Sequence, residues 1–283
     1  MPTPPRMKAD CHAHVIDPAC FPYAEGPGYK PHAGETGDRA AFFAALADNG
    51  VDCGLLVQPS CYGFDNAAML DAIAASRGRL KGIGVVEAGI AHQDMLALRR
   101  QGVVGARLNI GSFDPDFFRR AEAAPFLERC ADVGWFVEVY AIGDAWVPIA
   151  PVLASAGAKV IVDHMGHPDP AAGLDQPGFQ AVLSLASRHD ALVKLSSFFR
   201  VSREPWPHAD VEPFARETLQ AFGTERCIWG SDWPFIDTPR TARYGEQLDC
   251  LTRWLPDAGD REAVLWRNPA RLFGFGANGH ATH

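Results

Sequence analysis

The alternation of strand-like and helix-like segments constrains the fold of this chain more than any other feature. Short apolar, β-prone segments occur at residues 8–15, 51–58, 80–87, 103–110, 135–142, 158–164, 191–196 and 226–231. Several are continuously apolar, which is typical of parallel strands covered on both faces. Between them, apolar residues recur at helical spacing, as in 38–50, 65–78 and 212–223, and the closing stretch 243–273 also has a helical pattern. Eight such units predict an α/β fold, a closed (β/α)8 TIM barrel with right-handed crossovers.

The connections between these segments differ in length according to their direction. The turns from helix to strand are short and contain Gly50, Gly102, Gly134 or Gly223, and glycine suits the left-handed position that ends a helix. The loops from strand to helix are long and rich in Pro and Gly, at 15–37, 165–177, 197–208 and 232–241. Loops of that length are usually functional, and in a barrel they lie on the face that carries the active site. We therefore expect the site on that face, with the loop after the first strand, 15–37, forming a lid.

The composition is that of one globular domain. The chain has 283 residues, of which 47% are hydrophobic, and this is enough apolar material for a single large core. No domain boundary, low-complexity segment or further repeat interrupts the β-α pattern. We expect a single domain over 1–283, with frayed tails at 1–7 and 276–283.

Charge and cysteine usage exclude some classes of partner. The net charge is −8 and no block of basic residues occurs, which argues against nucleic acid as a partner. No apolar run is long enough to span a bilayer, and the N-terminus lacks the apolar segment of a signal peptide, so no membrane partner is expected. The seven Cys are odd in number and form no CxxC pair. This pattern favours free buried thiols in a reducing compartment, hence a cytoplasmic location. Assembly into a homo-oligomer stays open.

Two histidines end the first predicted strand. Residues i and i+2 of a strand point the same way, so His12 and His14 are expected to project together toward the mouth of the barrel. Two imidazoles so placed could bind a metal or polarise a carbonyl oxygen. The alternative is that one of them only caps the strand by hydrogen bonding.

Further ionisable groups end the sixth and eighth strands. His164 follows an apolar strand and precedes a Gly/Pro turn, which suits catalysis better than packing, although a buried pair with Asp163 is an alternative. His167 lies in the loop that follows. Asp232 comes directly after the last strand and could be a general base, a metal ligand or a helix cap. Trp233-Pro234 behind it makes an immediate helix unfavourable.

Polar residues also end the fourth and fifth strands. Arg107 and Asn109 have i, i+2 spacing, and Tyr140 follows Glu138 at the same spacing. A guanidinium can bind a substrate carboxylate through two parallel hydrogen bonds, which makes Arg107 a candidate for substrate binding. An ion pair between Arg107 and Glu138 on the adjacent strand is the alternative.

Five segments together resemble a known family: DCHAH, LVQPSCYGFDN, GARLN, VIVDHMGHPD and IWGSDWP. They are similar, in order and from Asp10 to about Phe273, to amidohydrolase-related proteins (amidohydrolase 2) of the 2-pyrone-4,6-dicarboxylate lactonase type. The resemblance implies a distorted TIM barrel and a hydrolase that acts on a cyclic ester, a lactone formed in aromatic compound catabolism or sugar-acid breakdown. It implies that His12, His14 and His164 surround the lactone carbonyl and that Asp232 activates the attacking water. It further implies substrate contacts from Tyr29, Ser60, Arg107 and Tyr140.

Three positions depart from the family pattern. His167 stands where the dicarboxylate lactonases have Arg, the segment 110–113 offers no second Arg, and Phe235 replaces a His. Two anion-binding positions are thereby weakened. We therefore expect a small lactone with one carboxylate or similar anion, held by Arg107, in place of the pyrone dicarboxylate.

The resemblance also bears on whether the site binds a metal. Metal-dependent amidohydrolases usually add a His at the end of strand five, where this chain has Tyr140. Only His12, His14 and Asp232 remain as ligands, and with a water they could complete a catalytic Zn site, or one for Mn. We favour no cofactor and a metal-free site, as in the lactonase branch.

Two other functions remain open. One is a metal-dependent non-oxidative decarboxylase of the same superfamily. The other is a catalytically silent binding barrel, in which four ionisable groups on three strand ends would have no use.

Overall fold

The strands of the computed structural model form one parallel sheet. The structure describes residues 7–26, 28–111, 114–188, 190–238 and 241–276. In these ranges the strands follow each other around the sheet in sequence order: β1 (Ala9–Ala13), β2 (Cys53–Val57), β3 (Leu80–Gly84), β4 (Val103–Asn109), β5 (Phe136–Tyr140), β6 (Lys159–Val162), β7 (Ala191–Ser196) and β8 (Cys227–Gly230). The eight strands form a nearly closed barrel, as the β-α alternation predicts.

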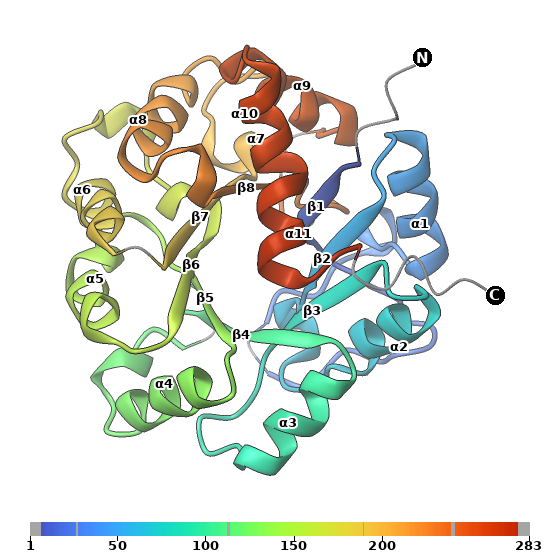
Figure 1. The fold of residues 1–283 in the computed structure, drawn as a ribbon. Coiled ribbons are helices and arrows are strands. Elements are labelled where there is room, and N and C mark those ends of the chain that lie inside the picture. Colours follow the sequence, from blue (N-terminus) through green and yellow to red (C-terminus); the bar gives the residue numbers. More distant parts are fainter. Residues whose placement is uncertain (1–6, 27, 112–113, 189, 239–240, 277–283) are drawn as a thin grey trace.

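Helices surround this ring of strands (Figure 1). Those that follow the first seven strands are α1 (Arg39–Asp48), α2 (Ala67–Ala75), α3 (His92–Arg100), α4 (Ala123–Asp132), α5 (Trp146–Ser155), α6 (Pro177–Ser184), the short α7 (Phe198–Val201) and α8 (Glu212–Phe222). After β8 come α9 (Tyr244–Trp254), α10 (Ala258–Glu262), a π-helical turn (Ala263–Arg267) and α11 (Asn268–Phe273). In Figure 1, α11 lies in front of the end of the barrel that faces the viewer.

Hydrogen bonds close the ring between β1 and the segment after β8. The backbone N–H of Asp232 donates to the His12 carbonyl, and that of His14 donates to the Trp233 carbonyl, both over 2.8 Å. The buried Asp10 carboxylate accepts from the Ser231 hydroxyl at 2.6 Å and from the Tyr244 hydroxyl at 2.8 Å. Residues more than 200 positions apart are thus held side by side, which brings both chain ends of the barrel to the same seam.

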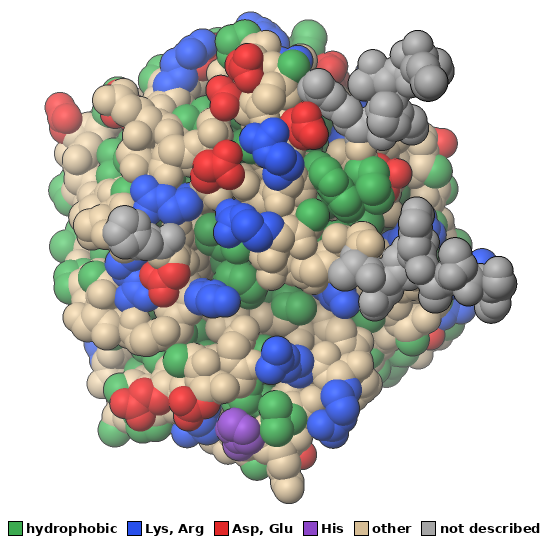
Figure 2. Space-filling view, in the orientation of Figure 1, with side chains coloured by type: hydrophobic (Ala, Val, Ile, Leu, Met, Phe, Trp, Pro, Cys, Tyr) green, Lys and Arg blue, Asp and Glu red, His purple; other side chains and the backbone are tan. Residues whose placement is uncertain are grey.

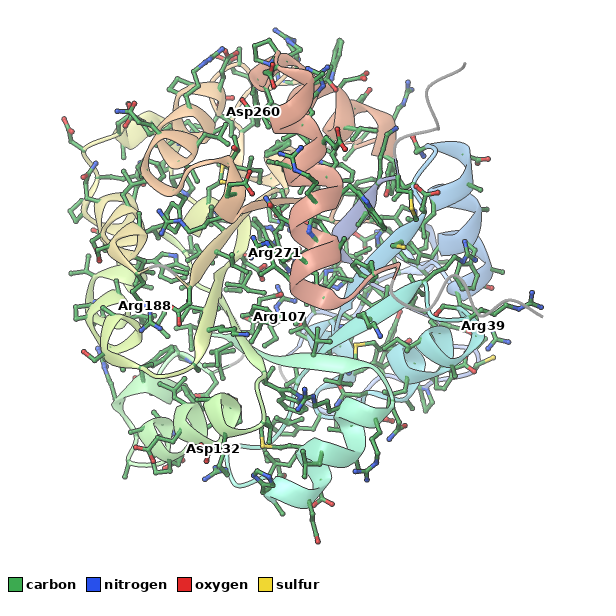
Figure 3. The ribbon with its side chains drawn as sticks, in the orientation of Figure 1. Arg39, Arg107, Asp132, Arg188, Asp260 and Arg271 are labelled. Carbon is green, nitrogen blue, oxygen red and sulfur yellow. The ribbon has the colours of Figure 1, made fainter. Side chains whose placement is uncertain are left out.

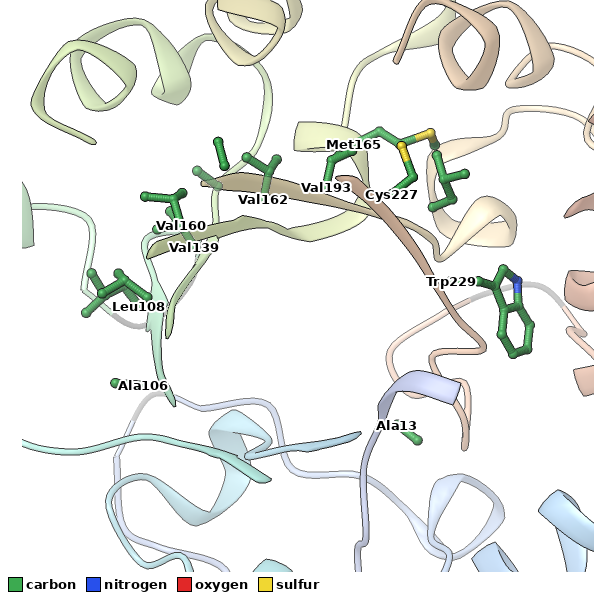
Figure 4. Close-up of a cluster of buried hydrophobic side chains, with 14 of the residues drawn as sticks. Ala13, Ala106, Leu108, Val139, Val160, Val162, Met165, Val193, Cys227 and Trp229 are labelled. Carbon is green, nitrogen blue, oxygen red and sulfur yellow. The ribbon is translucent and has the colours of Figure 1, made fainter. Parts of the chain in front are cut away.

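The core has an outer and an inner part. Figure 4 shows side chains such as Val160, Val193 and Trp229 pointing outward from the strands, where they pack against the helices. Inside the barrel, Cys11 and Leu55 join an apolar cluster that also contains Leu192, Ile228 and the α11 residue Phe273. Burial of each large apolar side chain contributes about 1.5–3 kcal/mol, so both parts stabilise the ring. The inner cluster forms an apolar floor below the polar residues described next.

The glycines at helix ends, the cysteines and the chain ends each test a prediction made from the sequence. Gly50 and Gly223, at helix ends, have positive φ of 61° and 72°, but Gly223 has a ψ of 154° and is therefore outside the left-handed helical conformation predicted for it. All seven cysteines are free, but Cys20 is exposed, because it lies in the loop after β1 and not in a strand. The expected tails, 1–7 and 276–283, fall outside the described residues except for Met7 and Gly276. Among the described residues, no helix has the length and apolar character needed to cross a bilayer.

Charged side chains of both signs are mixed on the face shown in Figure 2. Acidic and basic groups alternate around the α11 side of the molecule there.

Candidate active site

A cavity of about 280 Å³ opens at the carboxyl ends of the strands. Eight of the residues singled out in the sequence line it: His14, Tyr29, Ser60, Arg107, Asn109, Tyr140, His164 and Asp232. It is also lined by residues that were not foreseen, Pro59, Arg200, Ile236 and Asp237. His12 is fully buried beside Asp232, and His167 is not part of the lining.

The two histidines of β1 both face the interior. Their ring centroids lie 5.0 Å apart at nearly right angles. The pairing of β1 with β2 shifts register between Asp10 and Ala13, and this irregularity lets Cys11 join the apolar floor while His12 meets the polar residues above it. The Nδ1 of His14 lies 2.8 Å from the Val57 carbonyl, which can only accept, so Nδ1 carries a proton and Nε2 faces Asp232.

Asp232 is surrounded by cationic and hydrogen-bonding groups. Its Oδ1 lies 3.3 Å from His14 Nε2 and 3.7 Å from His12 Nε2, and its Oδ2 accepts a hydrogen bond from the Ser197 hydroxyl at 2.6 Å. The Nε of Arg200 is 3.5 Å from Oδ2. Burial by itself would raise the pKa of Asp232, but the hydrogen bond with His14 and the charge of Arg200 outweigh it and hold the pKa well below its usual value. Asp232 is therefore an ionised carboxylate at the base of the cavity.

His164 and His167 lie next to each other but in different surroundings. The Nδ1 of His164 is hydrogen bonded to the Ser196 hydroxyl at 2.7 Å, and its ring lies 4.5 Å from that of His12. Burial lowers the pKa of His164 to about 3, which leaves the ring neutral at physiological pH. His167 packs its ring edge-on to Tyr140, with centroids 6.0 Å apart, and burial lowers its pKa to about 4. His167 thus lies behind Tyr140 as seen from the cavity.

Three residues that follow neighbouring strands have a left-handed backbone. His164, Ser197 and Asp232 come after β6, β7 and β8, with φ of 51°, 58° and 62°. A non-glycine residue in this region costs of order 1–3 kcal/mol and persists only where its surroundings determine it. The hydrogen bonds of Ser196 to His164 and of Ser197 to Asp232 supply such surroundings. The strained turns aim the His164 and Asp232 side chains at the cavity.

A layer of charged side chains fills the barrel below the cavity. Arg107, labelled in Figure 3, places Nη2 3.3 Å from Asp163 Oδ2, whereas its Nε lies 3.8 Å from Glu138 Oε1. The fully buried Lys194 donates to Glu138 Oε2 at 2.5 Å and lies 3.2 Å from Asp163 Oδ1. We call these four residues and His12 the polar layer. Asp163, considered above only as a partner of His164, is the nearer partner of Arg107.

Lys194 and Arg200 were not predicted from the sequence as residues of the site. A signal for Lys194 was present, because a lysine inside the apolar strand ALVKLS is unusual and shares the inward parity of Leu192. Arg200 offered no such signal, because the sequence pattern gives 197–208 as a loop, whereas the structure places Arg200 in the short helix α7. The structure folds it over the cavity, where its guanidinium donates to the carbonyls of Ile236 and Asp237 at 2.5 and 2.9 Å. Residues 112–113, part of the segment that lacks the second Arg, lie outside the described residues.

Two groups of side chains could hold a metal ion. Potential ligand atoms lie within 4.8 Å of one another in the set His12, His14 and Asp232, and also in the set His12, Asp163 and His164. His14 Nε2 and Asp232 Oδ1 face each other and could share an ion. His12 fits this role poorly, because the ammonium of Lys194 lies 2.9 Å from its Nδ1 and constrains the position of its proton.

Comparisons with known proteins identify relatives along almost the whole chain. A family model described as amidohydrolase matches residues 9–275. A 4-sulfomuconolactone hydrolase of Rhizobium radiobacter is 33% identical over 95% of this chain and 91% of its own length. A 2-pyrone-4,6-dicarboxylate hydrolase of Comamonas testosteroni is 30% identical over 96% and 93%. A solved probable 2-pyrone-4,6-dicarboxylic acid hydrolase of Acinetobacter baumannii, with citric acid bound, is 30% identical with a TM-score of 0.82, covering 95% of this chain and 99% of that one.

A decarboxylase relative is more distant. The 5-carboxyvanillate decarboxylase of Sphingomonas paucimobilis has a TM-score of 0.65 over 95% of this chain and 99% of its own, but only 12% of the residues are identical. That likeness concerns the fold alone.

Proposed function

The chain belongs to the amidohydrolase family, and on that premise we propose that it is a hydrolase that opens a small carboxylated lactone by attack of water on the ring carbonyl. The observation that carries the proposal is the ionised Asp232 at the base of a small cavity, with the imidazoles of His12 and His14 within 3.7 Å of its Oδ1. The relatives that are at least 30% identical over nearly the whole chain are named for hydrolysis of lactones.

The cavity favours a small anionic ligand. Its volume of about 280 Å³ suits a single ring with short substituents. Two guanidinium groups, Arg107 and Arg200, line it, so a substrate carboxylate or sulfonate has two possible partners where the sequence suggested one. The remaining proposed substrate contacts are Tyr29, Ser60, Asn109 and Tyr140, with His167 acting through the ring of Tyr140.

In the proposed reaction, Asp232 accepts a proton from water as the water oxygen bonds to the lactone carbonyl carbon. The carbonyl oxygen becomes negatively charged, and we propose that His164, which lines the cavity, and the buried His12, whose ring lies 4.5 Å from it, donate hydrogen bonds to this oxygen. Collapse of the tetrahedral intermediate breaks the ring C–O bond, and the departing oxygen takes the proton that Asp232 accepted from water. At neutral pH the product is a carboxylate, so each turnover releases one proton.

We further propose that the reaction needs no metal. The support is the chemistry of the ligand set: Tyr140 stands where a fifth-strand histidine would complete the set, and His12 is constrained by Lys194. If an ion does bind, His14 and Asp232 would hold it, and it would supply a Lewis acid for the carbonyl. The decarboxylase alternative depends on such an ion.

The chain is proposed to be one domain over 1–283. The eight strands share one sheet, and the family model spans residues 9–275, which supports this proposal. The seven free cysteines support the proposal that it works in a reducing compartment, the cytoplasm.

A lactone library in weakly buffered indicator tests the function. We expect proton release with carboxylated or sulfonated lactones, faster than with their neutral analogues. If no lactone is opened, while an aromatic acid loses CO2 once zinc or manganese is added, the protein is the decarboxylase instead.

A further inference from the structure

Lys194 lies at the centre of the polar layer, although no step of the proposed reaction uses it. Its side chain is 0% exposed. The ammonium nitrogen donates to Glu138 Oε2 at 2.5 Å and lies 2.9 Å from His12 Nδ1, and it forms an ion pair with Asp163 Oδ1 at 3.2 Å. Burial would lower the pKa of Lys194, but the carboxylates of Asp163 and Glu138 outweigh it and raise the pKa, so the group is charged.

This contact determines where His12 carries its proton. A charged ammonium only donates, so the Nδ1 atom that it faces must accept. With Nδ1 accepting from the ammonium at 2.9 Å, only Nε2 of the imidazole is left to carry a proton. That proton is therefore on Nε2. Among the described residues Nε2 has no hydrogen-bond partner, and it lies beside Asp232, 3.7 Å from Oδ1.

We propose that Lys194 is a positioning residue that keeps the proton of His12 on Nε2, so that Nε2–H can donate to the lactone oxygen that becomes negative. A buried N–H without a partner is costly in the resting protein and is paired only when an acceptor enters the site. The reaction part of this inference rests on the proposed function.

The same contact keeps His12 from acting as a metal ligand. An imidazole binds a metal through a lone pair, and Nε2 has none while it carries the proton. Without the ammonium, Asp163 Oδ1 at 3.2 Å would be the nearest acceptor to Nδ1 among the described residues, with Glu138 Oε1 at 4.0 Å. The proton would then move to Nδ1, and the lone pair of Nε2 would join His14 and Asp232. Lys194 thus holds the site in its metal-free form.

The variant Lys194→Met tests both consequences. In protein labelled with ¹⁵N in its histidines, we expect the His12 resonances to show Nε2–H in the wild type and Nδ1–H in the variant, with assignment by a His12→Asn sample. The kcat on the best lactone should fall roughly 10²–10³-fold, the usual loss for one donor to an oxyanion, with a much smaller change in KM. Zinc affinity, measured by calorimetry without lactone, should rise at least about tenfold, which is 1.4 kcal/mol.

Two further variants control for folding and charge. Lys159→Met removes an exposed lysine at the start of β6 and should alter none of the three readouts. The double variant Lys194→Met/Glu138→Gln removes the buried ammonium together with the carboxyl group that accepts from it at 2.5 Å, and it should show the same tautomer change if the single variant is too unstable to study.

The outcomes separate this inference from the function itself. A wild-type His12 with its proton on Nδ1 would overturn the inference, and so would a folded variant that loses activity but retains the Nε2–H signal. If the tautomers behave as expected but no lactone is opened by the wild type, the proposed function fails while the control of His12 by Lys194 stands.

Discussion

Asp232 is the residue on which the proposed chemistry depends most. Asp232→Asn retains an oxygen that can accept from Ser197 but cannot take a proton from water, so kcat should fall roughly 10²–10⁴-fold, the usual contribution of a general base, with little change in KM. Asp175→Asn, the same change at an exposed position after β6, is the control and should behave as wild type. Turnover of Asp232→Asn within about tenfold of wild type would exclude the role of base.

The pH dependence follows from the direction of the same pKa. Because the pKa of Asp232 is lowered, the active ionised form persists below the usual range of a carboxyl group, and kcat/KM should fall only as the pH drops through that lowered pKa. His164, with a pKa of about 3, also remains neutral there. We expect kcat/KM on a stable lactone to be flat from about pH 8 down to about pH 5. An acid limb with a midpoint near pH 6 would instead indicate an ordinary histidine as the base.

Arg107 lines the cavity and also pairs with a buried carboxylate. If it binds the substrate anion, Arg107→Ala loses a charge-assisted hydrogen bond worth about 1.5–3 kcal/mol, and KM for an anionic lactone should rise by roughly one to two orders of magnitude. The methyl ester of that lactone should be unaffected. Equal losses on acid and ester would mean that the residue serves only its ion pair with Asp163, 3.3 Å away. The same kinetic measurements on Arg200→Ala, with the anionic lactone and its methyl ester, show which of the two guanidinium groups binds the anion.

At the scale of single residues, the polar groups at strand ends could be predicted from the sequence, whereas polar groups at other positions could not. His14, His164 and Asp232 could be predicted because the ends of parallel strands meet on one face of a barrel. The partners in the polar layer could not, because Arg107 lies nearer to Asp163, at 3.3 Å, than to Glu138, at 3.8 Å, although Glu138 is its register partner on β5. Strand spacing alone favours Glu138.

Among the elements, the loop after β1 is predicted to form a lid; this stays a prediction, and the hydrogen bonds of the loop offer a way to test it. The Tyr29 hydroxyl donates to Glu35 Oε2 at 2.6 Å, and Glu35 Oε1 accepts from the backbone N–H of Asp237 at 3.0 Å. This connects the loop to the segment after β8 across the cavity. The hydrogen bond to Glu35 raises the pKa of Tyr29 to about 12, so the hydroxyl remains a donor.

Tyr29→Phe tests the lid. Loss of a hydrogen bond worth about 0.5–1.5 kcal/mol should raise KM by roughly two- to tenfold with kcat less affected. Tyr23→Phe is the matched control, because its hydroxyl donates to the Pro31 carbonyl within the same loop, at 2.8 Å, and Tyr23 does not line the cavity. An equal rise in KM for both variants would show that loop stability, and not the link over the cavity, is being measured.

All eight strands were found where the periodicity predicted them, but some end earlier than expected. The sixth was predicted over 158–164 and covers Lys159–Val162, because His164 adopts a left-handed backbone that leaves the sheet. The register shift within β1 could not be predicted from the sequence either, because it depends on the pairing of β1 with β2 and on the seam with β8. In both places the backbone conformation depends on the geometry of the site and not on the local hydrophobic pattern of the sequence.

For the whole molecule, closure of the barrel is what turns scattered sequence positions into one site. The seam between β1 and the segment after β8 brings His12 and Asp232 together, and the long loops all begin at the same face. The overall architecture was predictable because a strict β-α alternation has few solutions. The unforeseen part is the charged interior, in which Lys194 occupies the centre.

The central claim is that this site adds water to a lactone carbonyl without a metal, and the most direct measurement follows the oxygen atom. Metal-stripped protein is given its best lactone in H2¹⁸O, and the ring-opened product is examined by mass spectrometry. We expect one ¹⁸O per product, in the new carboxylate and not in the hydroxyl, at a rate unchanged by chelator. A product without ¹⁸O would indicate isomerisation of the ring, and activity that is lost on chelation and restored by zinc or manganese would contradict the metal-free site.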